Sequence, residues 1–337
     1  MAANPKSPVA QEEETERYHV YHAEAHVLEG HLDHPIKQPF RHGRAVLEKS
    51  RREDHISELV KETSLEGLIS FKAGFTRVSG SQLKNKADLW GNDHSGWVTL
   101  STSVVEGLNV LEVITADRMV AQVSTEHPLE DGQVPKVTFL GTRFDNLRVS
   151  GFPVEFDLDL GICGTKPPDD QPYLYDSGFL DRVEAQLADH KAQLADAFAT
   201  EGVPEPLARR YSAEIEHIKK LKENADAGAK NDQDGYPKLK CSLVKKIGKI
   251  PIPGVKTFGN VIFIPDFGTV ALADVEVGIE ARHYDFPDRK RNGGPVEPSN
   301  SNYFTLRMLD MRLGCIGGGS LNGPTVTSNG SGSPGHH

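Results

Sequence analysis

Residues 97–104 read Trp-Val-Thr-Leu-Ser-Thr-Ser-Val, and this stretch indicates the fold class. Its alternate residues form two sets, Val98, Leu100, Thr102 and Val104 against Trp97, Thr99, Ser101 and Ser103. An alternation of period two places the two sets on opposite faces of a β-strand. The stretch therefore predicts a strand of an antiparallel sheet.

Similar short segments lie on both sides of this strand, separated by glycines that suit tight turns. Towards the C-terminus they are Leu108–Ile114, Arg118–Ser124, Val137–Leu140, Asn146–Val149 and Val154–Leu160, and then, after an interruption, Val261–Ile264, Thr269–Val277 and Tyr303–Leu313. Strands with one polar and one apolar face are typical of antiparallel sheets. The sequence predicts a mainly β protein with an antiparallel β-sandwich-like domain.

The interruption has helical spacing instead. Its apolar residues form two stripes, Leu180, Val183, Leu187, Leu194 and Phe198, and then Leu207, Tyr211, Ile215, Ile218 and Leu221. Asp176 or Ser177 suits the N-cap of the first helix, and Gly202–Pro206 separates the two. Each stripe needs a partner to be stable in water, so we expect an inserted α-helical hairpin.

These patterns divide the chain into five parts. We expect a disordered arm over 1–17, the first part of the β-domain over 18–163, and the inserted helical hairpin over 164–237. The second part of the β-domain then covers 238–316, and a disordered Gly/Ser-rich tail covers 317–337, since neither end has enough apolar residues to offset the cost of ordering the backbone. Residues 50–62 are expected to form a short surface helix or a loop.

Composition excludes several classes of protein. Among 337 residues, 38 Lys and Arg stand against 48 Asp and Glu, which gives a net charge of −10. Sequence-independent nucleic-acid binding rests on clustered cations, so we expect no nucleic-acid partner. No stretch approaches the roughly 20 apolar residues of a membrane-spanning helix. The polar first residues do not resemble a signal peptide, which predicts a cytoplasmic protein or a sequence that begins after a removed leader.

Several phrases together resemble a known family. They include Asn146-Leu147-Arg148-Val149-Ser150-Gly151-Phe152-Pro153-Val154 and, beyond the hairpin, Ile264-Pro265-Asp266-Phe267-Gly268-Thr269-Val270-Ala271-Leu272. Their order, over roughly 95–315 without the hairpin, resembles the bacterial surface-associated β-proteins labelled "choice-of-anchor P". The resemblance implies a surface location and offers no catalytic residues to carry over.

Histidines are concentrated near the start of the chain. If Tyr18–Leu28 is a strand, His22, Glu24 and His26 share one face. Imidazoles and a carboxylate on one face are ligands for a divalent transition metal such as zinc, nickel or iron. The alternative is that the opposite face is buried and that these three residues lie in solvent.

Two further groups of residues suggest sites. Trp90 and Trp97 bracket a polar loop with Asp93 and His94, a combination that suits carbohydrate binding, although such tryptophans also fix a hairpin to the core. Cys163 and Cys241 flank the hairpin and are the candidates for a disulfide; the alternative is three semi-buried thiols, with Cys315 as the third.

Three hypotheses of function follow. The first is a non-catalytic binding or self-assembling β-protein that uses the helical hairpin as its protein-partner surface, because strand patterns dominate and no catalytic signature appears. The second is a metal-dependent enzyme that uses His22, Glu24 and His26. The third is a carbohydrate-binding module built on Trp90 and Trp97.

Overall fold

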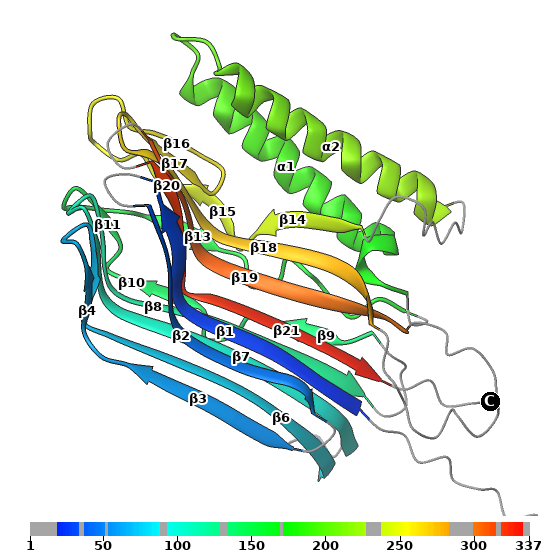
Figure 1. Ribbon diagram of the computed structural model, residues 1–337. Coiled ribbons are helices and arrows are strands. Elements are labelled where there is room, and N and C mark those ends of the chain that lie inside the picture. Colours follow the sequence, from blue (N-terminus) through cyan, green and yellow to red (C-terminus); the bar gives the residue numbers. More distant parts are fainter. Residues whose placement is uncertain are drawn as a thin grey trace, which may run out of the picture.

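The computed structural model describes residues 19–33, 37–50, 53–87, 93–128, 134–168, 171–226, 237–282, 299–314 and 318–332. In these residues the chain forms two antiparallel sheets that pack face to face, with a pair of helices against one of them (Figure 1). The prediction of a mainly β, sandwich-like protein with an inserted helical hairpin is confirmed.

One sheet has nine of the described strands. They run in the order β16 (Lys256–Phe258), β17 (Val261–Ile264), β18 (Gly268–Arg282), β19 (Ser299–Leu313), β20 (Gly319–Asn322), β1 (His19–Leu32) and β2 (Gln38–Ser50). Two more join this order: β14 (Lys238–Ser242) pairs with β18, and β21 (Thr325–Gly332) pairs with both β1 and β19. Strands from before and after the helices therefore share one sheet.

The other sheet has ten of the described strands. Its main order is β12 (Phe152–Pro153), β11 (Arg148–Val149), β8 (Ile114–Pro128), β7 (Asp93–Val110), β5 (Ile69–Phe71) and β4 (Thr63–Leu65). Beside these, β9 (Lys136–Thr138) and β10 (Arg143–Asp145) pair with β8, while β6 (Ala73–Ala87) pairs with β7 and β3 (Asp54–Val60). A small separate sheet joins β13 (Phe156–Leu158) to β15 (Val244–Ile247).

The interior between the sheets is apolar over most of its extent and hydroxylated where β7 and β8 face β21. Thr99, Ser101 and Ser103 are fully buried, so the Trp97 set of alternate residues is the inward one. Ser101 Oγ donates to the carbonyl oxygen of Thr327 at 2.7 Å, and the hydroxyls of Thr125 and Ser328 lie 2.7 Å apart. These bonds satisfy buried polar groups and join the two sheets directly.

The helices are as the apolar stripes predict. Helix α1 (Ser177–Ala197) begins at Asp176, whose carboxylate accepts from Phe179 N at 2.7 Å, and α2 is Glu205–Asp226. A short 3-10 helix, η1 (Tyr173–Tyr175), precedes α1. The two α-helices lie side by side over the end of the nine-stranded sheet that carries β14 and β16 (Figure 1).

Three expectations about local structure are wrong. The segment Leu108–Ile114 is not one strand: residues 108–110 end β7, residues 111–113 form a tight turn with Leu111 and Glu112 at positive φ, and Ile114 begins β8. In place of the helix or loop expected over 50–62, Asp54–Val60 form the strand β3.

The tail is the third correction. Residues 319–322 and 325–332 are strands, and β21 lies within the nine-stranded sheet, paired on both sides. The tail has few apolar residues to offset the cost of ordering its backbone. Two rows of main-chain hydrogen bonds and the burial of Leu321 and Val326 offset this cost instead. The predicted arm over 1–17 lies outside the described residues.

Candidate functional site

The three predicted metal ligands lie together on β1, but their groups are engaged with other residues. Tyr21, Ala23 and Ala25 fill the interior, so His22, Glu24 and His26 share the opposite face. Glu24 Oε1 lies 2.8 Å from His26 Nε2 and accepts from Arg44 Nε at 2.8 Å. These contacts lower the pKa of Glu24 to about 2, with the His26 hydrogen bond as the largest cause.

Arg44 and His26 both contact the same carboxylate oxygen of Glu24, Oε1. The Arg44 guanidinium is a permanent cation, and a second cation bound to the same carboxylate oxygen would be repelled by it. Among the described residues no group of three His, Cys, Asp or Glu side chains converges in a way that holds a metal ion. The cluster is better explained as a salt bridge that ties β1 to β2.

The predicted carbohydrate site is not a surface feature at Trp97. This ring is 8% exposed and stacks on His19 inside the sandwich, with ring centroids 5.4 Å apart. It therefore offers no face to a sugar. Trp90 lies outside the described residues, and the structure describes the backbone of Asp93 and His94 but not their side chains.

Cys163 and Cys241 are both buried and are not joined by a disulfide. Burial raises the pKa of the Cys163 thiol to about 12 and holds that of Cys241 well above its usual value. Both are therefore neutral thiols, which react slowly with electrophiles. Cys315 lies outside the described residues.

The helical hairpin uses its apolar side for packing within the chain. Phe179, Leu180, Val183 and Leu187 of α1 are buried, as is Ile218 of α2. The side chain of Gln186 also makes two hydrogen bonds of 2.9 Å with the backbone of Ser242 in β14. The surface predicted to bind a partner is therefore in large part the surface that holds the hairpin to the sheet.

A polar cluster lies beneath the hairpin, where the backbone of β18 is locally irregular. Ala273 takes a φ of +49° and is skipped in the register with β19. Ser242 Oγ donates to the carbonyl oxygens of Leu272 and Ala273, and Asn260 Nδ2 donates to Leu272 O at 3.0 Å and to Asp274 Oδ1 at 2.5 Å. These bonds satisfy backbone groups of a buried stretch in which the regular ladder is interrupted.

Asp274 is the unusual member of this polar cluster. It is 5% exposed, and its Oδ2 has no hydrogen-bond partner among the described residues. Burial, and then the charge of Asp310, raises the pKa of this carboxyl. Oδ2 and the unpartnered His190 Nε2 belong to residues that line one cavity of about 20 Å³, which is room for a single water molecule.

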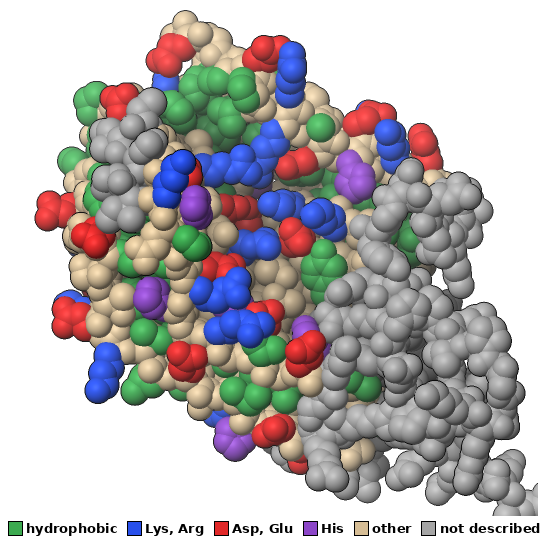
Figure 2. Space-filling model, in the orientation of Figure 1, with side chains coloured by type: hydrophobic (Ala, Val, Ile, Leu, Met, Phe, Trp, Pro, Cys, Tyr) green, Lys and Arg blue, Asp and Glu red, His purple; other side chains and the backbone are tan. Residues whose placement is uncertain are grey.

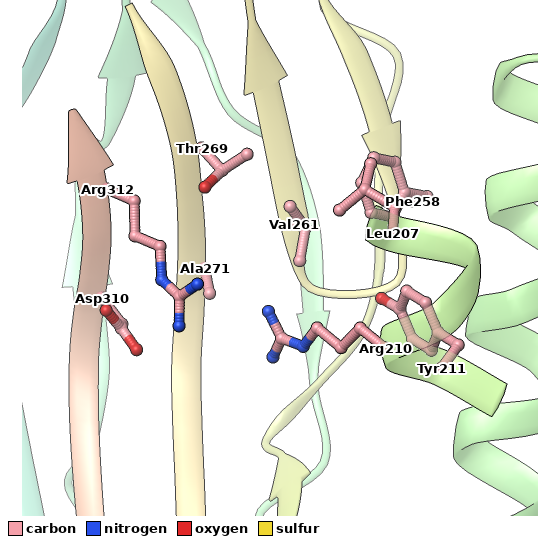
Figure 3. Close-up of a pocket in the computed structure, with 9 residues that line it drawn as sticks. All are labelled: Leu207, Arg210, Tyr211, Phe258, Val261, Thr269, Ala271, Asp310 and Arg312. Atoms are coloured by element: carbon pink, nitrogen blue, oxygen red, sulfur yellow. The ribbon is translucent and has the colours of Figure 1, made fainter. Parts of the chain in front are cut away.

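Next to this cavity, two arginines reach into an open hollow between α2 and the sheet. Figure 3 shows the guanidinium of Arg312, from β19, and that of Arg210, from α2, pointing towards each other across Ala271 and beside Asp310. Arg210 pairs with Glu214 at 3.1 Å. The cations and the carboxylates Asp274, Asp310 and Glu214 largely offset one another, so this hollow is a charge network that fixes α2 rather than a site for a strongly charged ligand.

The polar cluster also lacks the geometry of a catalytic site. His190 has a lowered pKa because it is desolvated, so its imidazole is neutral, and it packs on the backbone of Gly259. A Cβ at Gly259 would lie 2.4 Å from the ring, and its φ of +52° also favours glycine. Ser242 Oγ donates to the carbonyl oxygens of Leu272 and Ala273, and Cys241 is a buried neutral thiol, so neither of these described residues forms a nucleophile–base pair with His190.

A further hollow is a groove between the end of α1 and the loop that joins β15 to β16. Its volume is about 950 Å³, and it is lined by Gln193, Asp196 and Ala197 and by residues 246–257. This loop reads Lys-Ile-Gly-Lys-Ile-Pro-Ile-Pro-Gly-Val-Lys-Thr. We name this hollow the α1–loop groove.

The α1–loop groove is apolar with cations around it. Pro251 and Pro253 are exposed and Ile252 and Val255 half-buried, which leaves apolar surface in contact with water. Lys246 and Lys249 are exposed, and neither forms an ion pair with another described residue. Lys256 instead pairs with Glu201 at 3.0 Å. In Figure 2 hydrophobic side chains gather beside the turn of the hairpin, with charged side chains around them.

Sequence reasoning did not identify this groove. The alternation of lysine with isoleucine and proline in residues 245–256 is a local signal, since such a loop neither forms a strand throughout nor hides its cations. What the sequence cannot show is that the end of α1 forms the opposite wall.

Comparisons with known proteins give one match. No curated protein and no solved structure is similar to the chain at a significant level. No described helix is long and apolar enough to cross a membrane. A family model described as a domain of unknown function (DUF8256) matches residues 19–278, which is well over half of the sequence and includes β1, the helical hairpin and most of β18. The chain belongs to the DUF8256 family.

Proposed function

We propose that this protein is a non-catalytic binding protein that holds an acidic, partly apolar segment of a protein partner in the α1–loop groove. The observation that carries this proposal is the pairing of exposed apolar surface with two unpaired lysines, Lys246 and Lys249, around a hollow of about 950 Å³. Sites of this size bind ligands mainly through apolar contact, while a few charges fix orientation.

The charge of the groove selects the chemistry of the partner. Lys246, Lys249 and Lys256 stand against Asp196 among its lining residues, so the groove is locally positive in a chain whose net charge is −10. Such a surface attracts carboxylates and repels cations, and the effect acts on association rate and specificity. A segment with alternating acidic and apolar side chains matches both features.

The main-chain composition of the loop supports the same partner. Pro251 and Pro253 have no amide hydrogen, and residues 248–255, between β15 and β16, belong to no described strand. The carbonyl oxygens of Ile250 and Ile252 accept from Ile252 N at 2.8 Å and Val255 N at 3.2 Å, so the loop is held in a compact turn that meets a peptide as a preformed surface.

A direct titration tests this proposal. We expect a short fluorescein-labelled peptide of alternating glutamate and leucine to bind the full chain, as measured by fluorescence anisotropy. A peptide of alternating lysine and leucine is the control for apolar contact alone, and a polyglutamate peptide is the control for charge alone. Binding of the lysine peptide as tight as that of the glutamate peptide, or no binding of the glutamate peptide, would overturn the proposal.

A further inference from the structure

Strand β3 is an edge of the ten-stranded sheet. Among the described strands it pairs only with β6, in a register that places Asp54 opposite Gly80 and Val60 opposite Gly74. In Figure 1 it is the outermost ribbon along the lower side of the molecule. No described strand pairs with its other edge, and such an edge is a template for another strand.

The side chains of β3 are exposed on both faces of the sheet. Residues 54–59 are all exposed, and only Val60 is partly covered, by β2. Leu59 is 72% exposed and Ile56 38%, and because one is odd and the other even in number they lie on opposite faces. These are two of the four large hydrophobic residues that the structure exposes among its described residues.

We infer that β3 pairs with β3 of a second copy of this chain, antiparallel and about a two-fold axis at Ser57. In this register His55 faces Leu59 of the second copy, and Glu53 faces its Lys61. Because the axis repeats each contact, the dimer has two Glu53–Lys61 pairs, one at each end of the strand. Opposite charges directly across two strands stabilise the pairing.

Charge also excludes the neighbouring registers. A two-fold axis must pass through a residue, so the alternatives place it at Ile56 or at Glu58. An axis at Ile56 sets Asp54 opposite Glu58 of the second copy, and an axis at Glu58 sets Glu58 opposite itself. Both put like charges across the strands, which is destabilising. The axis at Ser57 is therefore the one that the sequence of β3 favours.

The length of β3 sets the strength of this dimer. Seven residues bury less surface than a standard stable interface, so we expect association that dissociates on dilution. The interface lies on a different sheet from the α1–loop groove, so each is tested without the other.

Sedimentation equilibrium of the full chain tests the inference, over protein concentrations from about 1 to 500 µM. We expect a monomer–dimer equilibrium that Leu59→Lys weakens at least tenfold. The matched control is Leu140→Lys, which adds the same charge at a residue that is 67% exposed and lies outside β3. A chain that is monomeric throughout, or a dimer that both variants affect equally, would overturn the inference.

A charge exchange tests the register. Lys61→Glu and Glu53→Lys should each weaken the dimer about tenfold, and the double variant should restore it. Restoration is needed because Glu53 Oε1 also accepts from Gln82 N at 2.8 Å, so the single change at Glu53 alters β6 as well. A double variant as weak as the singles would overturn the pairing at Ser57.

Discussion

Ser103 Oγ donates to the main-chain carbonyl oxygen of His26 at 2.6 Å, across the interior between the two sheets. Both residues are buried, and Ser103 is 0% exposed. A hydroxyl in the middle of a sandwich is stable only because it finds an acceptor on the opposite sheet. Small residues such as Ala23 and Ala25 line β1 there, so β1 and β7 approach closely. The close approach allows the hydrogen bond between Ser103 and His26 to form.

The first prediction concerns this hydrogen bond. Ser103→Ala should lower the free energy of unfolding by about 0.5–1.5 kcal/mol, because a buried hydrogen bond to the carbonyl of His26 is lost. Urea denaturation followed by circular dichroism measures it. Ser64→Ala, at an exposed serine of β4, should change stability by less than about 0.5 kcal/mol. Equal effects of the two changes would show that the contact between the sheets is unimportant.

The second prediction concerns the salt bridge on β1. The folded-state pKa of Glu24 is about 2 and its ordinary value 4.5, so its ionised form stabilises the fold above pH 4.5 and this contribution is lost as the pH falls towards 2. Glu24→Gln should therefore cost about 1–2 kcal/mol at pH 7, allowing for partial exposure, and little near pH 2.

The same variant separates the salt bridge from the predicted metal site. Unfolding of the wild type and of Glu24→Gln is measured with and without EDTA. Because Arg44 and His26 hold Glu24, the difference between the two proteins should not depend on the chelator. A difference that disappears in EDTA would favour a metal bound by His22, Glu24 and His26.

The third prediction concerns Asp274. Its pKa is raised in the folded state, so the wild type loses stability as the pH rises from about 3.8, the ordinary pKa, through the folded value. Asn at this position keeps the acceptor for Asn260 and has no charge to bury. The stability of Asp274→Asn relative to wild type should increase with pH, as measured by urea unfolding between pH 4 and 8. A difference that is constant or that falls with pH would contradict the raised pKa.

The sequence predicts individual strands and helices better than it predicts which strands pair with one another. The period of two at Trp97–Val104 and the stripe of Leu180, Val183 and Leu187 identify a strand and a helix because each depends only on local spacing. Local spacing does not predict strand β21, because residues such as Ser328 are held in place by pairing with β1 and β19, which lie elsewhere in the chain. The same holds for β3, whose exposed residues show no buried face.

For the candidate sites, too, the sequence predicts which residues share a face of a strand but not which residues from other strands contact them. The sequence brings His22, Glu24 and His26 to one face, but it cannot show that Arg44, from the neighbouring strand, takes the carboxylate. It suggests Trp97 as an exposed ring, whereas the register with His127 turns the ring inward. The α1–loop groove needs two segments about 50 residues apart, and only the folded chain brings them together.

The measurement that tests the proposed function most directly is the affinity of the glutamate–leucine peptide for two double variants. Lys246→Glu with Lys249→Glu reverses the two unpaired cations of the groove, and Lys219→Glu with Lys220→Glu makes the same change of net charge on exposed residues of α2. We predict that the first double variant binds at least tenfold more weakly than wild type and that the second binds within about threefold of it. Equal losses in the two double variants, or none in the first, would contradict binding in the α1–loop groove.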